Sequence, residues 1–120
     1  MGWRVERSED TDRDLEAIFD FLFEVAIGVG DAPEEAFVRA SRRIAAIEQA
    51  MLGLGRAPLQ GTSHPDLLPG LRHVTKDRAI FYFEVDERAR RVRVLAIFHG
   101  GQDHQRSMLV RLLRGGHQGS

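Results

Sequence analysis

Four basic side chains that could bind an anion lie within one stretch of predicted strands, residues 71–103. They are Arg72, Lys76, Arg78 and His99, and apolar residues separate them along the chain. Alternation of apolar and polar positions is typical of a strand in a sheet that is covered on one face. A row of basic side chains on the other face of such a sheet indicates an anionic partner.

His99 has two interpretations. It could donate a proton in catalysis, or it could be a structural histidine that hydrogen-bonds Asp103 across the Gly100–Gly101 turn. The structural interpretation is favoured, because titratable groups are also perturbed in purely structural settings. We expect Asp103 itself to cap the last helix rather than to take part in chemistry.

Other reactive patterns are missing from the sequence. The chain has no cysteine, so it has neither a disulfide nor a thiolate metal site. His64, His73, His99 and His104 fall on different predicted elements without the spacing of metal ligands, so we expect no metal site. The Gly100–Gly101 pair lacks the pattern of a phosphate-binding loop, and we expect no cofactor.

Two strands joined by a charged turn form the centre of the basic stretch. Residues 79–85 are aromatic and β-branched, as strands prefer, and residues 86–90 supply the turn. In the strand that follows, alternation predicts Val92, Val94 and Ala96 on one face, with Arg91 and Arg93 on the other. Farther along, the apolar run becomes continuous, so we expect that end of the strand to be buried on both sides.

Two amphipathic helices precede these strands. Ser8 is predicted to cap the first helix, which ends near Gly28. Asp31 is predicted to cap the second, with Pro33 in its first turn and Glu34 completing a capping box. The predicted apolar stripe of the second helix is Phe37, Ala40, Ile44, Ile47, Met51 and Leu54. Because a short loop joins the helices, they should form an antiparallel hairpin that buries its stripes against the sheet.

The order of these elements predicts an α+β fold. It comprises an N-terminal strand, an antiparallel two-helix hairpin packed on a small antiparallel β-sheet, and a short C-terminal helix. The N-terminal strand should lie beside a later strand. With 120 residues, the chain is expected to form a single domain over residues 1–114, followed by a flexible tail at 115–120.

Charge and apolar content narrow the class of protein. The formal net charge is −1, which argues against a general nucleic-acid coat. Acidic residues nevertheless dominate the first third, while arginine and histidine dominate the last half, so local fields can still steer a partner. No apolar run approaches the length of a membrane span, and the first residues lack the apolar core of a signal peptide. We expect a cytoplasmic protein with no membrane partner.

The order of several short segments along the chain is more informative than any one of them. These segments are residues 5–8, 14–18, 36–37, 44–54, 58–59, 70–72, 80–82 and 94–103. The last segment ends in His-Gly-x-x-Asp, from His99 to Asp103. Together they resemble the RelE/ParE toxin superfamily, the plasmid-stabilisation toxins of bacterial toxin–antitoxin pairs. The resemblance extends over about residues 3–103 and implies the same α+β fold.

The resemblance implies one of two activities. RelE-like and YoeB-like members are ribosome-dependent mRNA endoribonucleases, whereas ParE-like members inhibit DNA gyrase. Arg78 and His99 fall where YoeB-like enzymes carry an arginine and a histidine, so they are the catalytic candidates if the chain is a nuclease. Ala57 replaces the general base of those enzymes. Lys76 is the sole lysine, and no tyrosine follows Tyr82, so the RelE-like set is also incomplete.

These departures favour a ParE-like gyrase inhibitor that acts by protein binding, without intrinsic catalysis. An mRNA endoribonuclease of the RelE/YoeB type is one alternative. A diverged, non-toxic interaction module is another.

The resemblance also implies a cognate antitoxin, ParD-like or similar, with an acidic amphipathic segment that binds the toxin. The predicted partner-binding residues are Arg72, Lys76, Arg78, Arg91, Arg93, His99, Asp103, Phe21 and Phe23. Phe21 and Phe23 lie off the main apolar stripe of the first helix, so we expect an exposed apolar groove there. A homodimer through the same patch is the competing interpretation, and a merely solvated basic face is the alternative for the arginines.

Overall fold

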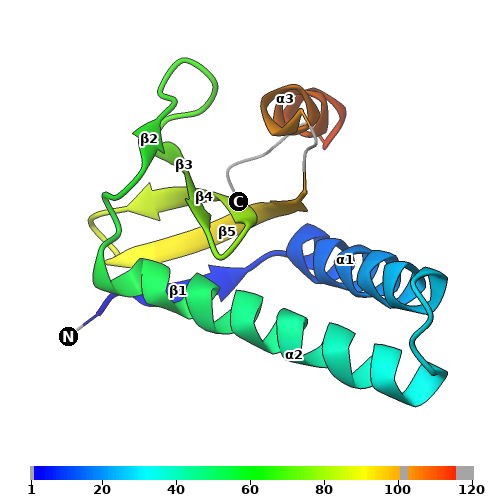
Figure 1. Cartoon of the computed structure of the whole chain (residues 1–120). Helices are drawn as coiled ribbons and strands as arrows, with labels where there is room; N and C mark the ends of the chain where they lie inside the picture. Colours follow the sequence, from blue (N-terminus) through cyan, green and yellow to red (C-terminus); the bar gives the residue numbers. More distant parts are fainter. Residues whose placement is uncertain (1, 101–102, 116–120) are drawn as a thin grey trace.

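The computed structural model describes residues 2–100 and 103–115. Its elements, in chain order, are β1 (Arg4–Arg7), α1 (Glu9–Gly28), α2 (Pro33–Leu52), the 3₁₀ turn η1 (Gly53–Arg56), β2 (Thr62–Ser63), β3 (Leu71–Lys76), β4 (Ala79–Asp86), β5 (Arg91–His99) and α3 (His104–Gly115). This order confirms the predicted α+β architecture (Figure 1). Gly101 of the predicted turn and tail residues 116–120 lie outside the described residues.

One five-stranded sheet has the order β1-β5-β4-β3-β2. Strands β2 to β5 are antiparallel neighbours. The N-terminal strand β1 lies beside β5, which confirms the prediction that it pairs with a later strand. The two strands are parallel, an orientation that the sequence did not specify. Its register runs from Arg4 opposite Arg91 to Arg7 opposite Val94.

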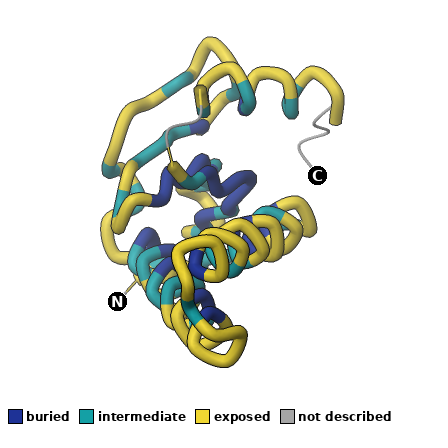
Figure 2. The backbone as a smooth tube through the Cα atoms, turned by 45° about the vertical axis from the view of Figure 1, so that its right-hand side comes forward, coloured by how far each residue is buried: buried dark blue, intermediate teal, exposed yellow. Residues whose placement is uncertain are grey.

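The α1–α2 hairpin covers one face of the sheet, and α3 lies over the other (Figure 1). Apolar side chains of the hairpin and the sheet form the main core: Leu15, Ile18, Ile47, Met51, Leu54, Ala79, Phe81, Phe83, Val92, Val94 and Ile97. A second cluster lies beneath α3: Leu71, Ile80, Tyr82, Leu95, Ala96, Phe98 and Met108. The central strands are therefore buried while the outer faces of the helices are exposed (Figure 2). The prediction that the end of β5 is buried on both sides is confirmed.

A β-bulge at Leu95 changes which side chains share a face of β5. Tyr82 pairs with Ala96 and Phe83 pairs with Val94, so Leu95 is an extra residue between them. Because side chains alternate along a strand, an extra residue reverses the alternation beyond it. The predicted common face for Val92, Val94 and Ala96 is therefore wrong for Ala96, which faces α3.

The helix starts follow local capping. Ser8 caps α1 as predicted, and its side chain accepts a hydrogen bond from the Thr11 N–H at 3.2 Å. The predicted cap of α2 is wrong by one residue, because Ala32 is the N-cap and Glu35 accepts from the Ala32 N–H at 3.1 Å. Pro33 is the first helical residue, and a residue before proline prefers extended backbone, so the helix cannot begin earlier.

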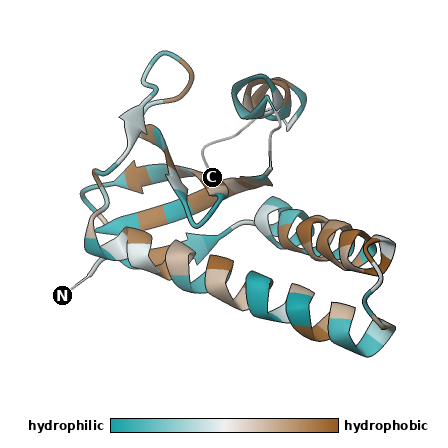
Figure 3. Cartoon of the chain, in the orientation of Figure 1, coloured by the Kyte–Doolittle hydropathy of each residue, from teal (hydrophilic) through white to brown (hydrophobic). Residues whose placement is uncertain are grey.

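The buried apolar stripe of α2 starts at Ala36, one residue before the predicted start at Phe37. Ala36 is fully buried, while Phe37 is 56% exposed and makes an edge contact with Phe19. Small buried residues on both helices, Ala26, Ala36 and Ala40, allow α1 and α2 to approach closely. Much of α1 is nonetheless apolar on its outer side, where Phe21 and Val25 remain exposed (Figure 3). No helix in the part of the chain that the structure describes is long and apolar enough to cross a membrane.

Candidate functional site

Three of the predicted basic residues gather at one end of the sheet. Lys76 is opposite Ala79 on one side, and His99 is opposite Ala79 on the other, so they lie in one row across three strands. Arg78 is exposed in the two-residue turn between β3 and β4, where Asp77 and Arg78 have φ angles of 55° and 66°. Positive φ at both turn residues gives the tight hairpin turn that suits the twist of antiparallel strands.

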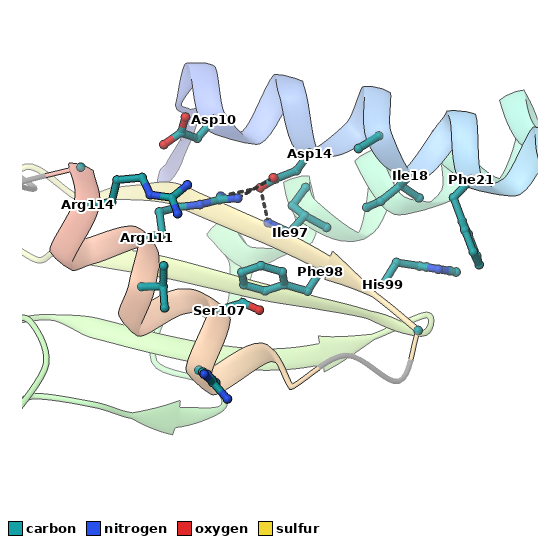
Figure 4. Close-up of a pocket in the computed structure, with 15 residues that line it drawn as sticks. Asp10, Asp14, Ile18, Phe21, Ile97, Phe98, His99, Ser107, Arg111 and Arg114 are labelled. Atoms are coloured by element: carbon teal, nitrogen blue, oxygen red, sulfur yellow. Dashed lines mark hydrogen bonds and ion pairs between the residues drawn. The ribbon is translucent and has the colours of Figure 1, made fainter.

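His99 lies on the hairpin side of β5, with its ring extending toward Phe21 (Figure 4). Both ring nitrogens are buried and have no hydrogen-bond partner among the described residues. Burial lowers the pKa of His99 from its ordinary value of 6.5, and the positive charges of Arg43 and Arg78 lower it further. The imidazole is therefore neutral near pH 7.

The predicted hydrogen bond between His99 and Asp103 is wrong. Asp103 instead caps α3, as the sequence analysis also predicts. Its carboxylate accepts a hydrogen bond from the Arg106 N–H at 3.2 Å, and its carbonyl accepts one from the Ser107 N–H at 3.1 Å. The reason is geometric, since His99 faces the helix hairpin whereas α3 lies on the opposite face of the sheet.

The remaining predicted arginines are partly occupied within the chain. Arg72 donates to the carbonyls of Leu59, Gln60 and Gly61 at distances from 2.6 to 3.2 Å, and so it fixes the loop that precedes β3. Arg91 pairs with Asp86 at 3.2 Å and with Glu6 at 3.8 Å. Arg93 lies opposite Glu84 in the register of β4 and β5.

An open groove of about 890 Å³ runs between α1 and α3, with β5 as its floor (Figure 4). Its wall on α1 includes Asp14 and Phe21, and its wall on α3 includes Arg106, Val110 and Arg114. Phe21 is 57% exposed, as the predicted apolar groove requires. Phe23 is half-buried and stacks on Phe19 with ring centroids 6.3 Å apart, so it lies outside this groove.

The α3 wall of the groove is cationic. Arg111 is held by Asp14 at 2.7 and 2.8 Å, and the hydrogen bonds to that carboxylate raise the pKa of Arg111. Arg106 and Arg114 are exposed and have no ion-pair partner among the described residues. Arg106 and Arg114 therefore place positive charge beside the apolar floor, across the groove from Asp10 on α1.

No protein-family model and no curated protein matches the sequence. Among solved structures, the chain is similar to one in the toxin–antitoxin complex RelBE2 from Mycobacterium tuberculosis. That match has 19% identity and a TM-score of 0.59, and covers 85% of this chain and 95% of the other. The chromosomal ParDE toxin–antitoxin system from P. aeruginosa gives 22% identity and a TM-score of 0.60, and covers 82% of this chain and 97% of the other.

The chain shares its fold with these chains of toxin–antitoxin systems. The predicted resemblance is thereby confirmed at the level of architecture, including the N-terminal strand, the helix hairpin and the antiparallel strands.

Ala57 stands where the sequence resemblance to YoeB-like enzymes implies a general base, so that position carries no acid. Ala57 is an exposed residue directly after η1, and its methyl group cannot take up a proton. Arg78 and His99 lie near enough for the charge of Arg78 to lower the pKa of His99. The two candidate nuclease residues are thus neighbours, without the base that would complete the set.

The structure also brings together histidines that the sequence placed on separate elements. His64, His73 and His104 meet Tyr82 on the α3 side of the sheet, whereas His99 lies on the other side. No group of three or more histidines and acids within residues 2–100 and 103–115 is arranged to hold a metal ion. The cluster was missed because its formation depends on how α3 and the loop after β2 pack on the β3–β4 hairpin, which no local pattern predicts.

Proposed function

We propose that this chain is the toxin component of a type II toxin–antitoxin system, of the ParE-like branch that inhibits DNA gyrase by protein binding. The observation that carries the proposal is a RelE/ParE fold whose nuclease set is incomplete. Ala57 supplies no base, and the ring nitrogens of His99 are buried. A buried neutral imidazole is poorly placed to protonate a leaving group on RNA.

Cationic contacts to gyrase are assigned to the end of the sheet. Arg78 is exposed at the tip of the β3–β4 turn, and Lys76 lies in the adjacent row. Arg43 reaches the same turn through an ion pair with Asp77 at 2.9 Å. This concentration of positive charge would favour an acidic partner surface.

A ribosome-dependent endoribonuclease of the RelE/YoeB type is the second candidate. It is supported by the proximity of Arg78 and His99, which could provide charge stabilisation and a titratable group if RNA binding exposed the His99 ring. A non-toxic interaction module is the third.

The antitoxin segment is assigned to the groove between α1 and α3. Phe21 and Val110 offer apolar contact on its two walls, and Arg106 and Arg114 offer charge for acidic side chains. An amphipathic acidic helix matches both features, because its apolar residues would meet the walls while its carboxylates meet the arginines. A homodimer through the same groove is the competing occupant.

Induced expression in a bacterial host separates the three functions. Growth arrest, inhibition of purified gyrase in a supercoiling assay and intact mRNA would support the proposal. Arg78→Glu should abolish gyrase inhibition, whereas Arg88→Glu, an equally exposed arginine in the turn at the opposite end of β4, should not. Cleaved mRNA that becomes intact in Arg78→Ala and His99→Ala would establish the ribonuclease instead. Unaffected growth would leave only the interaction module.

The antitoxin assignment needs its own test, with the protein encoded by the neighbouring reading frame as the probe. Phe21→Glu and Arg114→Glu should each weaken its binding at least about tenfold, since each removes an anchor of the groove. Val29→Ser, which changes an exposed apolar residue outside the groove, should leave binding unchanged. Light scattering of the isolated chain would identify a homodimer.

A further inference from the structure

Three imidazole rings meet between the β2–β3 region and the start of α3. Nε2 of His64 lies 2.5 Å from Nδ1 of His73, and the two ring planes differ by 19° with their centroids 4.7 Å apart. The ring of His104, the first residue of α3, has its centroid 5.1 Å from that of His73. His64 follows β2, His73 lies on β3 and His104 begins α3, so the three residues join this side of the sheet to α3.

Tyr82 on β4 forms the base of this cluster. Its side chain is fully buried, and His73 stacks on it with centroids 5.1 Å apart. Its hydroxyl lies 2.9 Å from Nδ1 of His104. We name His64, His73, His104 and Tyr82 the imidazole clasp, because these contacts connect α3 to two strands of the sheet.

The contacts of the imidazole clasp can form only while its rings carry little positive charge. The contact between His64 and His73 needs a lone pair on one of its two nitrogens, and that lone pair is lost when both rings are protonated. Burial lowers the pKa of His73 from 6.5, and the neighbouring His64 and His104 lower it further. The nearby carboxylate is that of Asp103, whose charge acts on Tyr82 and whose oxygen is already hydrogen-bonded to the Arg106 N–H.

We infer that protonation of the imidazole clasp in mildly acidic solution releases the first turns of α3 from the sheet. The clasp is closed while its rings are neutral. Protonation of His73 places a positive charge beside the buried Tyr82 ring and between the His64 and His104 rings, and opening returns that charge to water. The ion pair of Arg111 with Asp14 and the buried side chain of Met108 lie farther along α3, so release begins at His104.

The direction of the pH dependence follows from His73. Its pKa is lower in the closed state than the ordinary value of 6.5, so the open state binds the proton more tightly. The closed state is therefore fully favoured above this value and loses stability as the pH falls through it. Each unit by which the pKa is lowered corresponds to about a tenfold larger open fraction at the acidic end of the window. His99 shifts in the same direction and must be separated from the clasp.

Tyr82 is the sole tyrosine, so it reports on the clasp selectively. The test is NMR of the full chain with a labelled tyrosine ring and labelled backbone nitrogen, in buffers with EDTA from about pH 7.5 to about pH 5. We expect amide exchange in the first turns of α3, corrected for its intrinsic pH dependence, to rise as the pH falls below 6.5. The Tyr82 ring signals should move in parallel, while the amides of α1 and α2 stay protected.

Two variants test the cause. His73→Phe keeps a ring stacked on Tyr82 but cannot take up a proton, so it should abolish the acid-induced release. His104→Gln provides a second variant at the edge of the clasp and should move the release to lower pH. His99→Gln is the matched control and should leave the release unchanged. Unaltered α3 exchange in the native chain, release that persists in His73→Phe, or release that disappears in His99→Gln would each overturn the inference.

Discussion

Arg111 on α3 forms a two-point ion pair with Asp14 on α1, with its two terminal nitrogens 2.7 and 2.8 Å from the two carboxylate oxygens. The same carboxylate accepts a hydrogen bond from the Ile97 N–H at 2.9 Å. Because β1 pairs with β5 only as far as Val94, this part of the β5 edge has no neighbouring strand among residues 2–100 and 103–115. Asp14 therefore supplies the acceptor that a strand would have provided and fixes α3 against α1.

Asp14→Asn should lower the free energy of unfolding by about 1–3 kcal/mol, because Arg111 would remain partly buried without its counter-charge. The side chains of Asp14 and Arg111 are 12% and 28% exposed, so solvent screens this pair less than a surface pair. The measurement is urea unfolding at neutral pH. Asp10→Asn, which alters a more exposed pair with Arg13 on the same helix, should change stability by less than about 0.5 kcal/mol. Equal effects of the two substitutions would contradict the role assigned to Asp14.

Thr11→Val should destabilise the protein by about 1–2 kcal/mol, although the two side chains have nearly the same shape. The buried Thr11 hydroxyl donates to the Val94 carbonyl at 2.9 Å, at the point where β1 ends. Thr75→Val, at an exposed position of β3, is the matched control and should change stability by no more than about 0.5 kcal/mol. Thermal and urea unfolding of both variants would compare them, and a neutral Thr11→Val would show that this hydrogen bond adds nothing.

The pKa of His99 should lie below 6.5 in the folded protein, and Arg43→Met should raise it toward that value by removing a neighbouring positive charge. Because folded His99 binds its proton less tightly than the unfolded chain does, its contribution to stability decreases as the pH falls below 6.5. An NMR titration of the imidazole signals measures the pKa directly. Arg42→Met, at an exposed position one residue away, should leave it unchanged. A His99 pKa at or above the ordinary value would refute the buried, neutral state.

Ala36→Leu should lower the free energy of unfolding by about 1–3 kcal/mol, because the extra carbon atoms have no room between α1 and α2. Phe37→Gln should cost less than about 1 kcal/mol, since it removes a half-exposed ring and one edge contact with Phe19. Chemical unfolding of the two variants distinguishes the observed stripe of α2 from the predicted one. A larger loss from Phe37→Gln than from Ala36→Leu would restore the predicted stripe.

Local patterns predicted most of the architecture. The cap at Ser8, the helical spacing in α1 and α2, and the alternation in the strands are each determined by nearby residues, and each appears in the structure. The errors arise where neighbouring residues fit two registers. Leu95 is apolar whichever face it occupies, so the sequence could not reveal the bulge that reverses Ala96. Ala36 and Phe37 are both apolar, so periodicity alone could not decide which one is buried.

The candidate sites were harder to predict because they depend on contacts between distant residues. Asp14 and Arg111 form an ion pair although they are 97 residues apart in the sequence, and no spacing rule predicts such a pair. Arg72 is predicted to bind a partner, and its hydrogen bonds to backbone carbonyls of the irregular loop before β3 leave no trace in the sequence. The groove on α1 was anticipated through Phe21, whereas its cationic wall on α3 became evident only once the two helices were placed.

The pairing of β1 with β5 has a consequence for synthesis of the protein. Arg4 leaves the ribosome long before its partner Arg91, which belongs to the last of the described strands. A sheet with such distant partners closes late, because loop-closure entropy must be overcome before the contacts form. The nascent chain consequently lacks the completed core of this sheet until β5 has been translated, and any activity that needs the finished sheet begins only after the ribosome has passed the end of β5.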